Sequence, residues 1–128
     1  MKASTLEWIK KAEEDWETAQ ISYRARKVAL HNAACFHCQQ CIEKYLKARL
    51  NEAGIVPQKT HNLSDLLDDI LPTEPTWAPL RPLLIGLTKY AVLYRYPRFN
   101  ATKIEAKAAL KDCRDVRRVI RTAFGLPV

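Results

Sequence analysis

Apolar residues recur every three or four positions through two long stretches of this chain, and this spacing constrains the fold more than any other feature. In the first stretch, which ends near Lys27, the apolar row is Ile9, Ala12, Trp16, Ala19 and Tyr23. In the second, from about Asn32 to Ala53, the row is Ala34, Cys38, Cys41, Ile42, Tyr45 and Ala48. Each helical residue turns by about 100°, so each row occupies one face of a helix. With three glycines among 128 residues to form tight hairpins, the chain is expected to be all-α.

Capping signals divide the chain into about five helices. Ser4-x-x-Glu7 and Thr102-x-x-Glu105 have the spacing of a capping box, which predicts the starts of the first and last helices. Asn32 is expected to cap the second helix, and Gly54 and Gly125 to end the second and the last. The expected helices run approximately over residues 4–27, 32–53, 60–71, 80–94 and 102–125. Long helices with short connections predict one up-and-down antiparallel bundle, a single domain of residues 1–128.

The expected helices differ in how their apolar residues are distributed. The second is two-faced, and its polar face carries His37, Gln40, Glu43, Lys44 and Lys47. The fourth is apolar nearly all round, through Leu83, Leu84, Ile85, Leu87, Ala91, Val92 and Leu93. Such a helix is expected in the centre of a bundle or at a subunit interface. The last helix turns a basic stripe outward, made of Lys103, Lys107, Lys111, Arg114, Arg118 and Arg121.

The net charge of +7 is unevenly spread along the chain. From Arg95 to Arg121, nine Lys/Arg stand against three Asp/Glu, whereas residues 54–76 hold one Lys and four Asp/Glu. The loop Tyr94–Asn100, which contains Pro97, interleaves aromatic and basic residues. Basic side chains hold phosphates and aromatic rings stack on bases, so loop and stripe indicate a nucleotide or nucleic-acid site. The alternatives are a solvated stripe, an acidic protein partner, and aromatic rings that fill a helix junction.

The N-terminus and the cysteines bear on compartment and metal binding. Residues 1–4 lead directly into mixed charge, without the apolar stretch of a signal peptide or a membrane span. We therefore expect a soluble, cytoplasmic protein with no membrane contact, whose cysteines are thiols. Cys35-x-x-Cys38-x-x-Cys41 suggests a metal site, but three sulfurs at this spacing spread over about 120° of a helix and cannot converge on one ion. We expect these cysteines in the core, with no metal and no cofactor.

Three histidines are candidates for acid–base chemistry. His37, on the polar face of the second helix, is either a titrating group in a site or a solvated residue. His61 is expected to support the start of the third helix or to pack a loop, and His31 to lie on the surface. The sequence lacks a Walker loop, a Rossmann glycine pattern, a zinc-protease motif and a nucleophile elbow. The residues alone therefore indicate no catalytic centre.

Three segments, taken in order, form a more specific pattern. The first is Phe36-His37-x-Gln39-Gln40-x-x-Glu43-Lys44-x-x-Lys47-Ala48. The second is Gly54-x-x-Pro57-x-x-Thr60-His61-x-Leu63-x-x-Leu66-Leu67, and the third is Tyr94-Arg95-Tyr96-Pro97. In order and spacing they resemble the HEPN family of helical bundles found beside minimal nucleotidyltransferases in prokaryotes. The resemblance implies about five helices, commonly a homodimer, a minimal nucleotidyltransferase partner, and a toxin–antitoxin or defence role.

The resemblance also implies what catalysis would require. Some HEPN relatives are metal-independent endoribonucleases, with an Arg and a His separated by four to six residues at the start of the last helix and two copies meeting across a dimer cleft. Arg95 matches the Arg, but Asn100, Ala101 and Thr102 occupy the positions of the His. Cleavage of RNA without metal needs a group that takes the 2′-hydroxyl proton and returns one to the leaving oxygen, which Asn cannot do.

Three functions from different classes follow as hypotheses. The leading one is a non-catalytic HEPN module, a homodimer that binds a nucleotide or RNA and works with a minimal nucleotidyltransferase. Its binding residues would be Arg95, Tyr96, Arg98, Asn100, Lys107, Lys111, Arg114 and Arg118. The second is a metal-independent endoribonuclease in which Arg95 acts with His37 or His61. The third is a structural helical adaptor whose basic stripe docks on an acidic partner.

Overall fold

Seven helical segments and no strand make up the computed structural model, which describes residues 1–128. They are α1 (Ala3–Arg24), α2 (His31–Glu52), α3 (Leu63–Ile70), the 3-10 segment η1 (Pro75–Leu80), α4 (Arg81–Thr88), α5 (Tyr90–Leu93) and α6 (Lys103–Ala123). Helices α4 and α5 follow each other almost without a break, so together they correspond to the single helix expected over residues 80–94. The expected all-α bundle of about five helices is confirmed.

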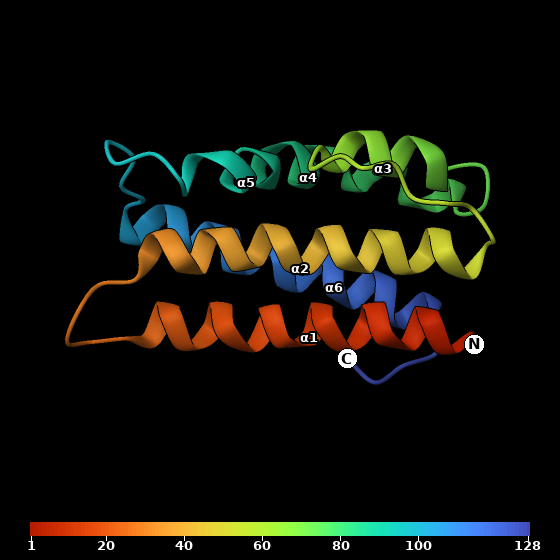
Figure 1. Cartoon of the computed structure of the whole chain (residues 1–128), viewed down its shortest axis with the longest axis horizontal. Coiled ribbons are helices and arrows are strands. Elements are labelled where there is room, and N and C mark those ends of the chain that lie inside the picture. The colour runs from red at the N-terminus through yellow and green to blue at the C-terminus, as the bar shows by residue number, and fades with distance from the viewer.

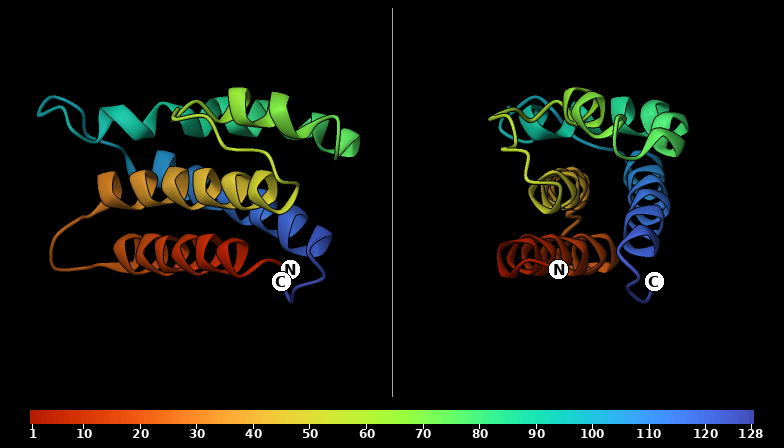
Figure 2. Two further views of the ribbon diagram at one scale, coloured as in Figure 1. Left: turned by 45° about the vertical axis from the view of Figure 1, so that its right-hand side comes forward. Right: turned by 90° about the vertical axis from the view of Figure 1, so that its right-hand side faces the viewer.

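The helices form a stack with one helix along its side. Figures 1 and 2 show α1, α2 and a layer of α3, η1, α4 and α5 in this order, while α6 runs beside the stack. The N-terminus lies at one end of α1 and the C-terminus beside the N-terminal half of that helix, while the α1–α2 and α5–α6 loops lie at the opposite end of the bundle (Figure 1). No helix is both long enough and apolar enough to cross a lipid bilayer.

Helix α2 occupies the centre of the bundle, because α1, α3, α5 and α6 all pack against it. It buries residues on almost every side, including the polar Gln39 and Glu43. The expected two-faced helix with a solvated polar side is therefore only partly right. The prediction that the fourth helix lies in the centre of the bundle is wrong, since Ile85 and Val92 are 60% and 49% exposed. Because α2 already fills the centre, the all-apolar segment lies in an outer layer with part of its apolar surface uncovered.

The start of α1 is held by α2 rather than by a cap of its own. The expected capping box of Ser4 and Glu7 is wrong, because the helix already begins at Ala3 and has no side-chain cap. Ser4 Oγ instead accepts a hydrogen bond from Asn51 Nδ2 at 2.8 Å. A short polar residue near a helix start thus serves a tertiary contact, which local spacing does not distinguish from a cap. The helix also ends at Arg24, slightly before the expected Lys27.

Asn32 has a different role from the expected one. Helix α2 begins at His31 without a side-chain cap, so Asn32 is its second residue. The Asn32 amide instead donates from Nδ2 to the carbonyl of Phe99 (3.2 Å) and accepts at Oδ1 from the N–H of Ala101 (2.6 Å). An amide has one donor and one acceptor end, and here both are used to fasten the α5–α6 loop to α2.

The remaining capping signals are confirmed. Thr102 and Glu105 form a reciprocal capping box at the start of α6. Gly54 and Gly125 have φ angles of +76° and +72°, the left-handed conformation that glycine adopts without a steric penalty after a helix end.

Helix α6 is fixed to α1 and α2 by a polar cluster around Glu13. Arg117 donates to both carboxylate oxygens of Glu13, from Nε at 2.8 Å and from Nη2 at 2.6 Å. The Tyr45 hydroxyl donates to Glu13 Oε2 at 2.7 Å and accepts from Arg121 Nη1 at 2.9 Å. Arg121 is therefore half-buried and bonded within the fold, so it does not face outward with the rest of the expected basic stripe.

Candidate functional site

Positive charge gathers at the end of the bundle where the α1–α2 loop, the α5–α6 loop and the start of α6 meet (Figure 1). Residues 18–42 and 89–111 build this end, and they contain nine Lys/Arg and a single Asp/Glu. The nine are Arg24, Arg26, Lys27, Lys89, Arg95, Arg98, Lys103, Lys107 and Lys111. The acid, Glu105, is engaged in the capping box. Because the whole chain has 21 Lys/Arg and 14 Asp/Glu, this end accounts for all of its net positive charge.

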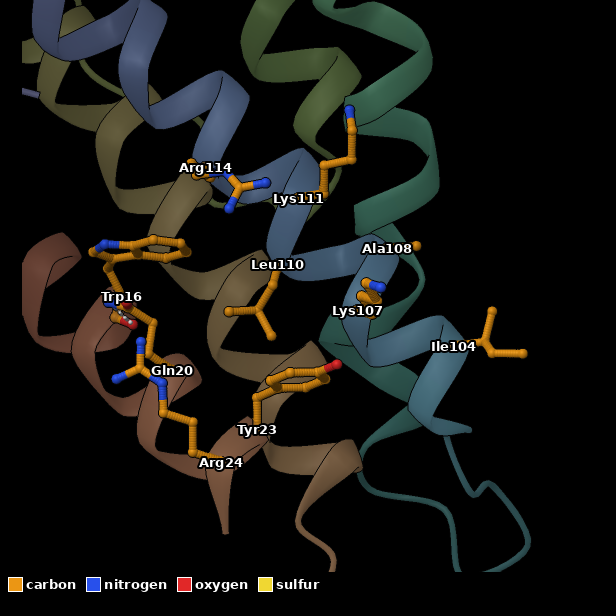
Figure 3. Close-up of a pocket in the computed structure, with 10 residues that line it drawn as sticks. All are labelled: Trp16, Gln20, Tyr23, Arg24, Ile104, Lys107, Ala108, Leu110, Lys111 and Arg114. Atoms are coloured by element: carbon orange, nitrogen blue, oxygen red, sulfur yellow. Dashed lines mark hydrogen bonds between the residues drawn. The ribbon is translucent and has the colours of Figure 1, made fainter.

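A groove between α1 and α6 opens at this end and has a volume of about 630 Å³ (Figure 3). Its lining residues are Trp16, Gln20, Tyr23, Arg24, Ile104, Lys107, Ala108, Leu110, Lys111 and Arg114. Four of them are cations and none is an acid. Only Lys111 forms an ion pair, with Asp115 at 3.0 Å. Uncompensated positive charge along a concave surface attracts anions, and the apolar walls concentrate the field.

The groove divides the expected basic stripe. Lys107, Lys111 and Arg114 line it, whereas Arg118 lines a separate hollow that also contains Glu74 and Asp115. These two acids pair with other cations, Glu74 with Arg49 and Asp115 with Lys111, but they make this hollow less positive than the acid-free groove. Arg118 is therefore a weaker candidate for binding phosphate than the other three.

Helix α1 contributes groove residues that the sequence did not single out for binding, namely Tyr23 and Arg24. A signal was present in the basic run Arg24-x-Arg26-Lys27, but its relation to α6 depends on the packing of helices far apart in the sequence.

The α5–α6 loop separates its aromatic residues into two groups. Tyr94 stacks on Phe36 of α2, with ring centroids 4.5 Å apart, and Phe99 lies 6.1 Å from Tyr90. Phe99 is half-buried at the helix junction, whereas Tyr94 covers Phe36 and is itself 43% exposed. Tyr96 is 58% exposed and is free to contact a ligand. The side chains of Arg95, Arg98 and Asn100 in the same loop are also exposed.

Two histidines lie on a separate surface, here called the histidine face, together with two buried carboxylates. His37 Nδ1 is 2.8 Å from Asp15 Oδ1. His61 Nδ1 is 2.8 Å from Glu43 Oε1. Lys44 also contacts Asp15, and Lys47 also contacts Glu43. His61 therefore fastens the α2–α3 loop to α2, consistent with its expected packing role, while the cap of α3 comes from Asn62.

The histidine face and the groove lie on different sides of the bundle. Helix α2 meets α6 through Cys38, Cys41 and Tyr45. None of the residues of the histidine face lines the groove, neither the two histidines nor Asp15, Glu43, Lys44 and Lys47. A single chain thus does not combine His37 or His61 with the groove. The loop is closer to His37, because Phe36 contacts both His37 (5.2 Å between rings) and Tyr94.

The cysteines serve as core residues, as expected. All four are fully buried thiols, and Cys38 and Cys41 of α2 lie against Cys113 of α6. Burial raises the pKa of the Cys35 thiol to about 12. At neutral pH such a thiol stays protonated and is a poor nucleophile.

Comparison with known proteins decides the family. The HEPN domain model matches residues 5–123, nearly the whole chain. The chain belongs to the HEPN family. A Methanocaldococcus jannaschii protein named "Putative toxin MJ1304" is 30% identical to this HEPN protein over 131 residues, covering 89% of this chain and 84% of the relative. The crystal structure of TT1696 from Thermus thermophilus superimposes with a TM-score of 0.81 at 26% identity, covering 94% of this chain and 98% of the other.

Acid is expected to destabilise this HEPN protein through Glu13 and Glu43. Burial favours a raised pKa for both carboxylates, but hydrogen bonds from Arg117 and Tyr45 to Glu13, and from His61, Gln39 and Lys47 to Glu43, outweigh it and lower both pKa values. In the unfolded chain the pKa of each carboxyl group has its ordinary value of 4.5, and in the folded protein it is lower. The ionised carboxylate therefore stabilises the fold fully at pH values above 4.5, and this stabilisation is lost as the pH falls through the folded-state pKa. Each carboxylate should contribute about 1–2 kcal/mol.

Urea unfolding between pH 7 and pH 3 measures this loss. Glu13→Gln/Glu43→Gln should be less stable than the wild type at pH 7 and should lose less stability on acidification. Glu17→Gln, at an exposed position without an ion pair, is the matched control. If the free energy of unfolding fell equally with pH in the wild type and the double variant, Glu13 and Glu43 would not be the groups responsible for the acid sensitivity.

Proposed function

We propose that this HEPN protein binds RNA or a nucleotide through the α1–α6 groove and the Arg95–Asn100 loop. The observation that carries the proposal is the acid-free groove, with its four cations, at the end that holds the net charge of the chain. Arginine offers bidentate hydrogen bonds to phosphate, and lysine a compact charge. Tyr96 supplies an exposed ring for a base, and Asn100 an amide with both a donor and an acceptor.

The cellular role that we propose is in a toxin–antitoxin or defence pair with a minimal nucleotidyltransferase. Two findings support it: membership of the HEPN family and the word toxin in the name of the Methanocaldococcus relative. In such a pair the HEPN protein would bind the RNA or nucleotide, while the partner supplies transferase chemistry.

We further propose that the protein binds without cleaving. No histidine stands at the three positions where active HEPN relatives have one. Asn100 is exposed, Ala101 is buried with its N–H bonded to Asn32, and Thr102 caps α6. None of these side chains titrates near neutral pH. Arg95 can therefore hold phosphate charge, but it has no imidazole at the family position to move a proton.

Binding of labelled RNA and of labelled ATP over a salt series tests the proposed function. We expect binding that weakens with salt, because phosphate contacts release counterions. Arg95→Ala/Arg98→Ala should weaken it about thirtyfold, at about 1 kcal/mol per cation near an anionic surface. Failure to bind either ligand at low salt would overturn the proposal and favour an adaptor that docks on an acidic protein.

We also propose that two copies associate through α4 and α5. Ile85 of α4 and Val92 of α5 are 60% and 49% exposed and lie seven residues, about two helical turns, apart along this outer layer. An apolar row of this kind typically marks an interface. Light scattering at micromolar concentration should give twice the 14.7 kDa mass of one chain, and Ile85→Glu/Val92→Glu should give one chain mass.

The matched control for the dimer uses apolar residues that are equally exposed elsewhere. Ile21 and Val28 are 66% and 67% exposed at the end of α1 and in the following loop. Ile21→Glu/Val28→Glu should therefore stay dimeric. A wild type that has the mass of one chain at micromolar concentration would contradict the interface.

A second candidate function is metal-independent RNA cleavage by Arg95 with a displaced histidine. The favouring observation is that His37 and His61 each place one ring nitrogen 2.8 Å from a buried carboxylate, which orients the imidazole and leaves its other nitrogen available. Of the two, His37 is closer to the Arg95 loop through Phe36 and Tyr94. Cleavage in chelator that is lost in His37→Ala would support this candidate.

A further inference from the structure

The α1–α6 groove continues beyond the volume described above. Tyr23 and Arg24 line both this groove and a neighbouring hollow of about 440 Å³. The hollow adds Arg26 from the α1–α2 connection, His31 from the start of α2 and Lys103 from the start of α6. Because the two volumes share a wall, they form one track along α6, here called the α1–α6 track.

The track is long enough for several nucleotides. Its α6 side extends from Lys103 to Arg114, which are eleven residues apart. At a rise of 1.5 Å per residue this is about 16 Å. Stacked nucleotides are spaced by about 3.4 Å along one strand, so the track matches about five of them. A mononucleotide would fill only a fraction of it.

The charge of the track is uniform along its length. Six cations line it, and no acid does: Arg24, Arg26, Lys103, Lys107, Lys111 and Arg114. Five of the six form no ion pair within the chain, the exception being Lys111. Regularly placed cations suit a ligand that carries one phosphate per repeat, rather than a compact anion with a single cluster of charge.

The floor of the track offers aromatic surface. Tyr23 and His31 are half-buried rings with centroids 6.4 Å apart and planes inclined by 42°. Figure 3 shows Tyr23 between α1 and α6, next to Leu110 and facing the side of the groove that carries Lys107. Trp16 is less available, because it is 9% exposed and Arg117 lies 5.6 Å from its ring centroid. Tyr23 is thus the ring best placed to meet a base.

We propose that the α1–α6 track is a binding site for single-stranded RNA of about five nucleotides. Its phosphates contact the cations of α6 and of the α1–α2 loop, and a base stacks on Tyr23. A duplex has its bases paired and stacked internally, so it cannot offer a base face to a ring within a groove. This inference rests on the proposed function and specifies the ligand and the path that it takes.

A length series of unlabelled RNA in competition with a fluorescent decamer tests the path. Affinity should rise steeply from two to about five nucleotides and only slowly beyond, and a duplex should bind more weakly than a single strand of the same length. Tyr23→Leu keeps an apolar side chain against Leu110 but removes the ring, and it should weaken binding of the pentamer at least about fivefold. Tyr23→Phe should bind like the wild type.

A charge variant keeps the test decisive if Tyr23→Leu does not fold. Arg26 and Lys103 are exposed and unpaired, so Arg26→Ala/Lys103→Ala should fold normally. It should weaken pentamer binding about thirtyfold, whereas Lys10→Ala/Lys11→Ala on the exposed side of α1 should change it less than about twofold. If Tyr23→Leu and Arg26→Ala/Lys103→Ala both bind the pentamer as tightly as the wild type does, or if the wild type prefers duplex, the α1–α6 track is not the RNA-binding path. Either result would leave the proposed RNA binding itself intact. Absence of any RNA binding by the wild type would instead overturn the proposed function.

Discussion

Alanine substitution of Lys107, Lys111 and Arg114 is expected to weaken RNA binding about a hundredfold at physiological salt, at about 1 kcal/mol per cation. All three line the acid-free groove. Each contact with a phosphate of a single strand contributes about −0.7 to the slope of log affinity against log salt. The triple variant should therefore also flatten this slope by about two. Fluorescence anisotropy over a salt series measures both quantities.

The control for the triple variant removes the same charge from another surface. Lys10, Lys11 and Lys59 are exposed and lie outside the groove. Their replacement by alanine should leave affinity within about threefold of the wild type, because distant surface charges are screened. The loss of the Lys111–Asp115 pair should barely change stability, since an exposed ion pair contributes little. Equal losses of affinity in the two triple variants would show that only net charge matters and would contradict the groove.

The wild type is expected to leave RNA intact, whereas Asn100→His is expected to cleave it in an Arg95-dependent manner. A positioned acid–base group typically contributes about a hundredfold to ten-thousandfold in rate. Asn100 is exposed next to the start of α6, so a histidine fits there without disturbing the core. Its imidazole would stand at the family position relative to Arg95, whose guanidinium stabilises charge that develops on the phosphate.

Incubation of structured and unstructured RNA with chelator, after removal of copurified nucleases, measures this difference. Asn100→His/Arg95→Ala is the matched control and should be inactive. Cleavage by the wild type that disappears in Arg95→Ala would contradict the non-catalytic assignment. His37→Ala and His61→Ala would then identify which imidazole replaces the missing one.

Much of the fold could be predicted because helices are encoded by local patterns. The apolar spacing and glycine positions located the helices, and the capping box of Thr102 and Glu105 is present as expected. The misassigned caps at Ser4 and Asn32 have a common cause. A short polar side chain near a helix start bonds equally well to a local N–H or to a distant partner, and only tertiary packing decides.

The choice of the central helix could not be predicted from hydrophobicity alone. The segment around α4 is the most apolar, yet α2 fills the centre with small residues such as Ala34 and Ala48, which allow close helix packing, and with the paired polar side chains of Gln39 and Glu43. Polar residues that hydrogen-bond to one another are tolerated in a core, which a count of apolar residues does not reveal.

The candidate site was only half visible in the sequence. The basic residues of α6 and of the Arg95 loop are close in sequence and stand out by charge. The opposite wall of the groove, with Tyr23 and Arg24, comes from a helix about eighty residues away. The same packing removes Arg121 from the stripe, because Tyr45 and Glu13 bind it.

Amide chemical shifts recorded while single-stranded RNA is added to the isotope-labelled protein test RNA binding and its location together. The chain of 14.7 kDa suits such spectra even as a dimer. We expect the largest shifts at Tyr23, Arg24, residues 95–100 except Pro97, and residues 103–114, diminishing with salt, and no shifts in α3 or η1. Shifts confined to the histidine face around His37 and His61, or an unchanged spectrum at low salt, would contradict binding in the basic groove.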